Sequence, residues 1–274
     1  MSDEQPAHFT AVDGGFQPTR YAQSHWGDDH LNGPAIVGLA AREMERRHGA
    51  DDFMPTRLTV DLFKAARGVL TTVQTRLVRD GRRVRNVECD VVQDGVTVAR
   101  GVLVSYRRSS PPPGEQWSPV PDFVMPAAAE SEPDSAVTPF TGSDEVGWTR
   151  KVGEHQNASR TRFLDRTIAV VAATPNTPFV RAAMIAESTS LTTNLGTHGI
   201  GYINGDLTVA LARLPEDGWL GTQADAHWAA DGIAVGSATL FDSVGPFGTG
   251  LITAVANPAA QIDFGSPTFN GMRL

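Results

Sequence analysis

The feature that most constrains the fold of this chain is an internal repeat, because the second half of the sequence restates the first. Residues 58–62 read LTVDL and residues 207–211 read LTVAL, so the two segments differ at one position, at an offset of 149. Turn signals follow in the same order at offsets of 149 to 151: Asp80-Gly81 with Asp231-Gly232, Gly95 with Gly245, and Gly101 with Gly250. Such a period is too long for a solenoid and suits a domain of ordinary size. We therefore predict a duplicated domain.

Each half contains a helix that is apolar on nearly every side. The first begins at Gly33-Pro34 and the second at Asn176-Thr177-Pro178, and proline is tolerated there because the first-turn N–H groups have no intrahelical partner. Helices with so little polar surface must be buried. At the offset between the two prolines, Glu187 corresponds to Glu43.

After each helix, apolar and polar residues alternate, which predicts antiparallel strands. In the first half we expect about four strands joined in sequence, with two-residue hairpin turns at Asp80-Gly81 and Asp94-Gly95, where glycine can take a positive φ. In the second half the predicted strands cover residues 206–214, 219–227, 233–241 and 247–256.

Composition divides the 274 residues into four parts. Residues 1–17 lack periodicity and are predicted to be a loose N-terminal arm. Residues 18–108 form the N-terminal domain and residues 144–274 the C-terminal domain. Residues 109–143 are rich in proline, alanine and acidic residues, which indicates a linker, and their length is natural between two domains.

Charge and cysteine usage exclude several classes of protein. A net charge of −8 argues against nucleic acid as a partner. Cys89 is the only cysteine, so a disulfide framework is excluded. Because no apolar run is long enough to span a bilayer and the N-terminus lacks a signal-peptide pattern, we expect no membrane insertion and a cytoplasmic protein.

The densest basic cluster surrounds the first predicted hairpin turn and includes Arg82, Arg83 and Arg85. It is a candidate for binding substrate phosphates, or else a solvated turn that keeps a sheet edge charged. The histidines show no ligand spacing, so we expect no metal. The sequence also lacks a Gly-x-Ser-x-Gly elbow and a glycine-rich nucleotide loop.

A buried helix followed by antiparallel strands packs well when the sheet curls around the helix, and two copies would meet edge to edge. The segments that carry a family resemblance are residues 25–34, 204–209 (NGDLTV), 218–220 (GWL) and 231–234 (DGIA). On these segments the chain resembles the double-hotdog acyl-CoA thioesterases of the thioesterase II type. The resemblance implies an α+β fold of tandem hotdogs, each a long buried helix wrapped by an antiparallel sheet.

The resemblance also implies an activity, the hydrolysis of acyl-CoA to free fatty acid and coenzyme A, with coenzyme A as part of the substrate and no separate cofactor. Catalysis in the family is attributed to an Asp near the end of the second helix, a Thr on the strand after it and a Gln on the last strand. These positions fall on Glu187, on Asn204 and near Ile252. The neighbouring Thr253 could replace the Gln only if a bulge or register shift turns it inward.

Backbone N–H groups at the start of a helix can stabilise an oxyanion, which makes Asn32 and Gly33 candidate substrate-binding residues. Structural roles are the alternatives for the catalytic candidates. Glu187 could be a helix-terminal carboxylate bonded to Ser188, Ser190 or water, and Asn204 could be a turn residue.

Two other functions stay open at this point. The loss of the Gln favours a non-catalytic acyl-CoA or lipid-binding protein. A hotdog hydratase should show Asp-x-Asn-x-x-His before its helix, whereas residues 29–32 (DHLN) hold these residue types in the wrong order. Because hotdog sheets pair through their edges or faces, we expect a homodimer.

Overall fold

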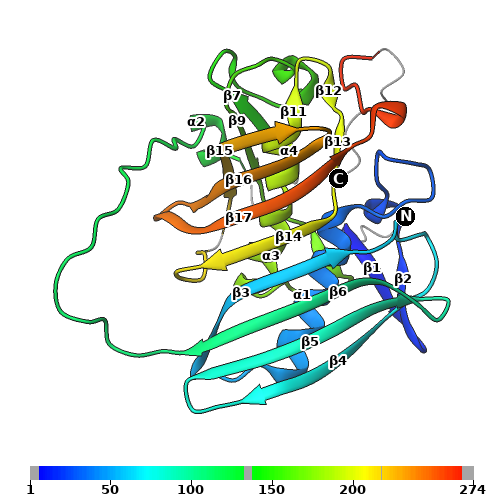
Figure 1. The fold of residues 1–274 in the computed structure, drawn as a ribbon, viewed down its shortest axis with the longest axis vertical. Helices are drawn as coiled ribbons and strands as arrows, with labels where there is room; N and C mark the ends of the chain where they lie inside the picture. The colour runs from blue at the N-terminus through cyan, green and yellow to red at the C-terminus, as the bar shows by residue number, and fades with distance from the viewer. Residues whose placement is uncertain (1–5, 133–137, 217, 267–274) are drawn as a thin grey trace.

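The computed structural model of the protein describes residues 6–132, 138–216 and 218–266. Two central helices are wrapped by one long, curved sheet, and the chain crosses between its two halves through an extended loop (Figure 1). The tandem-hotdog prediction is confirmed by this arrangement.

The central helices are α1 (Gly33–His48) and α3 (Pro178–Glu187), and α3 is followed at once by the short α4 (Thr189–Asn194). Each long helix begins as predicted, with proline in its first turn and a side-chain cap: Asn32 accepts from the Ala35 N–H at 2.9 Å and Thr177 accepts from the Val180 N–H at 3.2 Å. The helices pack closely, because a Cβ on Gly38 of α1 would lie only 2.9 Å from Met184 Cγ of α3.

The two halves build the same four-stranded unit. The first contains β3 (Phe53–Leu62), β4 (Thr71–Asp80), β5 (Val84–Gln93) and β6 (Val96–Arg107), in the spatial order β4-β5-β6-β3. The second contains β14 (Asp206–Leu211), β15 (Leu220–Ala230), β16 (Ile233–Asp242) and β17 (Gly245–Ala256), in the order β15-β16-β17-β14. The strands are antiparallel as predicted, but β3 and β14 pair with the last strand of their unit, which leaves each of them free to pair with the other.

The edge-to-edge pairing of β3 with β14 confirms the duplication (Figure 1). Thr59 lies opposite its repeat counterpart Thr208, and their hydroxyl oxygens are 2.9 Å apart. Leu58 lies opposite Val209, and Val60 lies opposite Leu207. In the repeat, Leu58 corresponds to Leu207 and Val60 corresponds to Val209, so the same symmetry relates these two pairs. A pseudo-twofold axis therefore passes between the two threonines.

One hydrophobic core extends through both halves. The fully buried side chains include Leu39, Leu58, Phe179, Ile185 and Leu207. Burial of each contributes roughly 1.5–3 kcal/mol, so the shared core couples the stability of the two repeats.

The N-terminal residues differ from the prediction. Where a loose arm was expected, β1 (Ala7–Val12) and β2 (Gly15–Pro18) belong to the sheet. β1 pairs in parallel with β10 (Ala169–Val171) of the second half, and β2 continues to β4. The cause is apolar burial, since Phe9 is completely enclosed by the core.

The remaining elements are short. Beyond β15 the sheet continues through β9 (Thr161–Asp165), β7 (Phe140–Ser143) and β8 (Gly147–Thr149). β11 (Leu195–Gly196) pairs with β12 (Gly199–Ile200), and β13 (Tyr202–Asn204) pairs with β17. The described residues also contain the 3-10 turns η1 (Arg20–Ala22), η2 (Val152–His155) and η3 (Pro258–Ala260).

Two of the predicted hairpin turns are confirmed and one is wrong. The turns Asp94-Gly95 and Asp231-Gly232 have a positive φ at both residues, as tight two-residue turns require. Residues 81–83 instead connect β4 to β5, so Asp80-Gly81 is not a two-residue turn, and Gly81 does not take a positive φ.

Over its described residues the expected linker carries the short helix α2 (Ala127–Glu130), ends in strand β7, and is partly anchored. Phe123 stacks on Phe241 of β16 with ring centroids 4.5 Å apart, whereas Trp117 is 88 % exposed. Among the helices of the described residues, none combines the length and the apolar character needed to cross a membrane.

Candidate functional site

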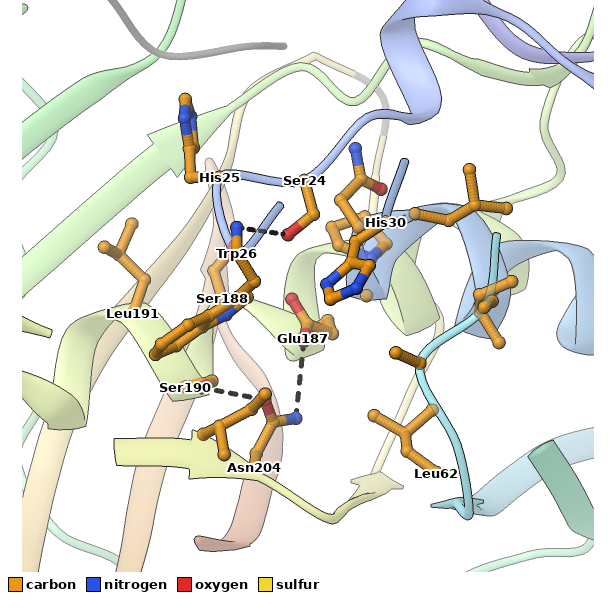
Figure 2. A pocket seen from close by; sticks show the side chains of 18 of the residues that line it. Ser24, His25, Trp26, His30, Leu62, Glu187, Ser188, Ser190, Leu191 and Asn204 are labelled. Atoms are coloured by element: carbon orange, nitrogen blue, oxygen red, sulfur yellow. Dashed lines mark hydrogen bonds between the residues drawn. The ribbon is translucent and has the colours of Figure 1, made fainter. Parts of the chain in front are cut away.

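A cavity of about 470 Å³ lies where α1 begins and α3 ends. Both halves line it, and Figure 2 shows side chains from the loop before α1, the end of α3, α4 and the segment around Asn204 meeting there. Its walls are mostly apolar, and its polar side chains include Ser24, His30, Asn32, Glu187, Ser190 and Asn204.

Glu187 is the last residue of α3 and turns its carboxyl group into the cavity (Figure 2). Burial raises its pKa from 4.5 to about 7, and a hydrogen bond from the Asn204 side chain acts in the opposite direction. A carboxyl group with this pKa can accept or release a proton at neutral pH, which is the property that general acid–base catalysis needs.

Asn204 is placed by β13, which holds it opposite Ala254 of β17. The Ser190 hydroxyl donates to Asn204 Oδ1 at 3.1 Å, and Asn204 Nδ2 donates to Glu187 Oε1 at 3.4 Å (Figure 2). Because the serine hydroxyl binds the amide oxygen, the amide nitrogen is directed toward the carboxylate. Ser190, Asn204 and Glu187 thus form one hydrogen-bonded chain.

Gly33 lies directly against the Glu187 carboxyl group. A Cβ on Gly33 would be 2.0 Å from Glu187 Oε1 and 2.2 Å from Cδ, so only glycine leaves room for this contact. The first N–H groups of a helix have no intrahelical acceptor. Since Asn32 caps Ala35 and Pro34 has no N–H, the Gly33 N–H is the first-turn donor that remains for a ligand.

Asn32 is close to the same place, but its side chain is used to hold the helix start. Its oxygen caps Ala35, and its Nδ2 donates to the carbonyl oxygens of Tyr21 at 3.0 Å and Gln23 at 3.4 Å. The buried His8 donates through Nδ1 to the same Tyr21 oxygen at 3.0 Å. Asn32 therefore positions Gly33 through the fold of the loop.

Thr253 is not brought to Glu187. β17 pairs regularly with β16 around it, so the bulge that would turn it inward is missing at this position. Its N–H donates to Asp206 Oδ1 at 2.9 Å, its hydroxyl donates to Asp206 Oδ2, and its side chain lies on the exposed face. Ile252 faces the core and is fully buried. The alternation of strand side chains separates the two residues.

The arginine cluster lies at the opposite end of the first sheet from the cavity. Arg85 is level with Ser105 of β6 and hence with Pro55 near the start of β3, whereas Leu62 at the end of β3 lines the cavity. At about 3.3 Å per residue, this places the cluster roughly 23 Å from Leu62 along the strand. Arg85 pairs with Asp80 at 3.0 Å, and Arg82, Arg83 and Arg85 are not among the residues that line the cavity.

Ser190, which the sequence offered as a possible partner of Glu187, is one turn beyond it and binds Asn204 instead. The structure also shows two site residues that the sequence did not single out. His30 and Trp26 belong to the loop before α1 and line the cavity (Figure 2). Their position in the segment that carries the family resemblance was the available signal.

The carboxylate that corresponds to Glu187 in the first repeat has a different environment. Burial would raise the pKa of Glu43, but hydrogen bonds and charges from Arg46, Arg42 and Arg47 hold it below 4.5. Glu187, not Glu43, is therefore the repeat carboxyl that can exchange a proton near neutral pH. In the described ranges no three His, Cys, Asp or Glu side chains are grouped as metal ligands.

Solved structures share this fold at low sequence identity. A candidate thioesterase II from Thermobifida fusca YX has a TM-score of 0.69 and 14 % identity over 94 % of this chain and 99 % of its own. A hot dog fold protein of unknown function from Alicyclobacillus acidocaldarius has a TM-score of 0.66 and 17 % identity, over 90 % of this chain and 95 % of its own. An acyl-CoA thioesterase II, TesB2, from Mycobacterium marinum has a TM-score of 0.60 and 14 % identity, over 82 % of this chain and 88 % of its own.

Family models match most of the sequence. Residues 22–105 match the acyl-CoA thioesterase N-terminal domain, and residues 109–251 match the acyl-CoA thioesterase C-terminal domain. No curated protein is similar enough to the sequence to count as a match. The two family matches cover both repeats in order, and the chain therefore belongs to the acyl-CoA thioesterase family.

Proposed function

We propose that this protein hydrolyses acyl-CoA to a free fatty acid and coenzyme A. The observation that carries the proposal is Glu187, whose carboxyl group has a pKa of about 7 and lies against the N-terminus of α1 in a largely apolar cavity. A cavity of about 470 Å³ is within the range of small-molecule sites. Phe163, Ile168 and Met184 on its wall suit an acyl chain.

The reaction assigns one role to each group. The Glu187 carboxylate takes a proton from water, and the water oxygen bonds to the thioester carbonyl carbon. The Gly33 N–H, with the positive end of the α1 dipole behind it, stabilises the oxyanion that forms. When the carbon–sulfur bond breaks, protonated Glu187 returns its proton to the leaving thiolate of coenzyme A.

Asn204 orients the carboxylate and is in turn oriented by Ser190. In this proposal, two side chains and a backbone N–H perform the reaction without the family's Gln, whose place is apolar here. Thr253 has no part in it, since its hydroxyl binds Asp206 on the other face of the sheet.

The second candidate function is non-catalytic binding of acyl-CoA or another lipid, and Ile252 in place of the Gln is the observation that favours it. The residues that line the cavity do not support the hydratase alternative. Asp29 accepts from the Gly68 N–H at 3.1 Å and does not line the cavity.

Purified protein incubated with acyl-CoAs of graded chain length, with free thiol measured, tests the proposal. Thiol release that is lost in Glu187→Gln, with folding retained, supports the thioesterase. Acyl-CoA binding without thiol release at any chain length would refute it in favour of the binding protein.

A further inference from the structure

We propose that Phe63 and Lys64 bind the nucleotide half of coenzyme A at the rim of the cavity. The proposal rests on the proposed function and extends it, because it makes the nucleotide a recognised part of the substrate. A thioester of pantetheine carries the same reacting group but lacks the nucleotide.

The rim is a continuation of a cavity wall. β3 ends at Leu62, which lines the cavity, and the lining continues through Phe63 and Lys64. The N–H groups of Phe63 and Lys64 both donate to the Val98 carbonyl of β6, at 3.0 and 3.2 Å. The Leu31 N–H, from the loop before α1, donates to the Ala66 carbonyl at 2.9 Å. The rim backbone is thus held between the sheet and the start of α1.

Lys64 supplies a positive charge that the fold leaves available. No other lysine or arginine of the described residues lines the cavity. Within the described ranges Lys64 forms no ion pair, whereas the nearby Arg100 is paired with Asp90 at 2.7 Å. A protein with a net charge of −8 repels polyanions in general. An available ammonium group at the cavity rim opposes that repulsion at the place where phosphates would arrive.

Phe63 supplies an aromatic surface next to this charge. Its side chain is 54 % exposed and directly follows β3, which ends at the half-buried Leu62. The Arg100 guanidinium lies 5.9 Å from the ring centroid. An exposed ring at the mouth of a cavity is a platform on which a base can stack, and such stacking adds to the attraction of a cation for phosphate.

If the proposal is right, removing the charge of Lys64 should weaken the binding of acyl-CoA, whereas removing a charge from the distant arginine cluster should not. Lys64→Gln and Arg83→Gln each remove one positive charge, so they alter the overall field equally. Arg83 is exposed near the start of β5, at the end of the sheet away from the cavity. A difference between these variants therefore reports position and not net charge.

The experiment measures kcat and KM for an acyl-CoA and the matching acyl-pantetheine in wild type and both variants. The wild type should prefer the acyl-CoA through a lower KM. Lys64→Gln should raise the KM for acyl-CoA by roughly fivefold and leave the KM for acyl-pantetheine in place. Arg83→Gln should behave as wild type. Phe63→Ala should also raise only the KM for acyl-CoA.

A second measurement separates this proposal from the thioesterase itself. Binding of adenosine 3′,5′-bisphosphate, followed by calorimetry, should weaken in Lys64→Gln but not in Arg83→Gln, whether or not the protein turns over thioesters. Equal KM values for the two wild-type substrates would overturn the nucleotide site. So would an Arg83→Gln variant that loses as much affinity as Lys64→Gln, or Lys64→Gln affecting both substrates alike.

Discussion

Replacing Glu187 by Gln should stabilise the folded protein at alkaline pH, because the wild-type carboxyl group is buried where its charge is disfavoured. Its pKa is 4.5 in the unfolded chain and about 7 in the folded one. The folded state therefore binds the proton more tightly, and ionisation weakens folding as pH rises from 4.5 to 7. The penalty is almost absent at pH 4 and constant above pH 7.

The size of the effect follows from the shift. A shift of one pKa unit is about 1.36 kcal/mol, so the wild type loses up to about 3 kcal/mol of unfolding free energy at pH 8 and about 0.2 kcal/mol at pH 4. Gln keeps the shape and can still accept the hydrogen bond from Asn204. The variant should therefore gain stability at pH 8 and resemble the wild type at pH 4.

Urea unfolding of both proteins at pH 4, 6 and 8 checks this prediction. Glu43→Gln is the matched control with the opposite sign, because its carboxylate is stabilised by three arginines. It should lose stability at pH 8 and lose less as the pH falls through the lowered pKa of Glu43. A Glu187→Gln variant that gains less than about 1 kcal/mol between pH 4 and pH 8 would refute the buried-carboxyl reasoning.

Three further predictions concern activity. Gly33→Ala should lower kcat by about 100-fold or more, because the added methyl group displaces Glu187 from the helix start; steady-state thiol release and circular dichroism separate this from unfolding. Asn204→Ala should lower kcat/KM by roughly tenfold. It should also shift the rise of activity to higher pH, because the lost hydrogen bond had lowered the pKa of Glu187. A pH profile of activity that does not shift would exclude this contact. Thr253→Val should retain wild-type kcat and KM, since its side chain binds Asp206 on the exposed face; a large loss of kcat would return Thr253 to the site.

The fold could be predicted from the sequence because its determinants are local and repeated. Three features can be recognised without knowledge of tertiary contacts: the apolar helices, the alternation of apolar and polar residues after them, and the repeat offset of 149. The N-terminal strands could not be found in this way, because β1 is fixed by pairing with β10, which is distant in sequence. Domain boundaries, a homodimer and a cytoplasmic location stay predictions.

The site was predictable only where it depends on helix ends. Glu187 and Gly33 each mark a helix terminus, and antiparallel packing of α1 against α3 brings these termini together. Thr253 and the arginines depend on strand register instead. A one-residue difference puts Thr253 on the other face from Ile252, and the pairing of β5 with β6 puts Arg85 level with the start of β3. Neither relation can be read from composition.

The duplication explains why a nearly symmetric fold can hold an asymmetric site. Each helix start has an acidic neighbour from the other helix, Glu187 at the start of α1 and Glu45 at the start of α3. At the start of α1, Gly33 has no side chain, and Glu187 faces the cavity. At the start of α3 the corresponding residue is Thr177, whose hydroxyl donates to Glu45. One helix start is thus left available for a ligand while its counterpart is closed by a side-chain hydrogen bond, and both continue to support the shared core.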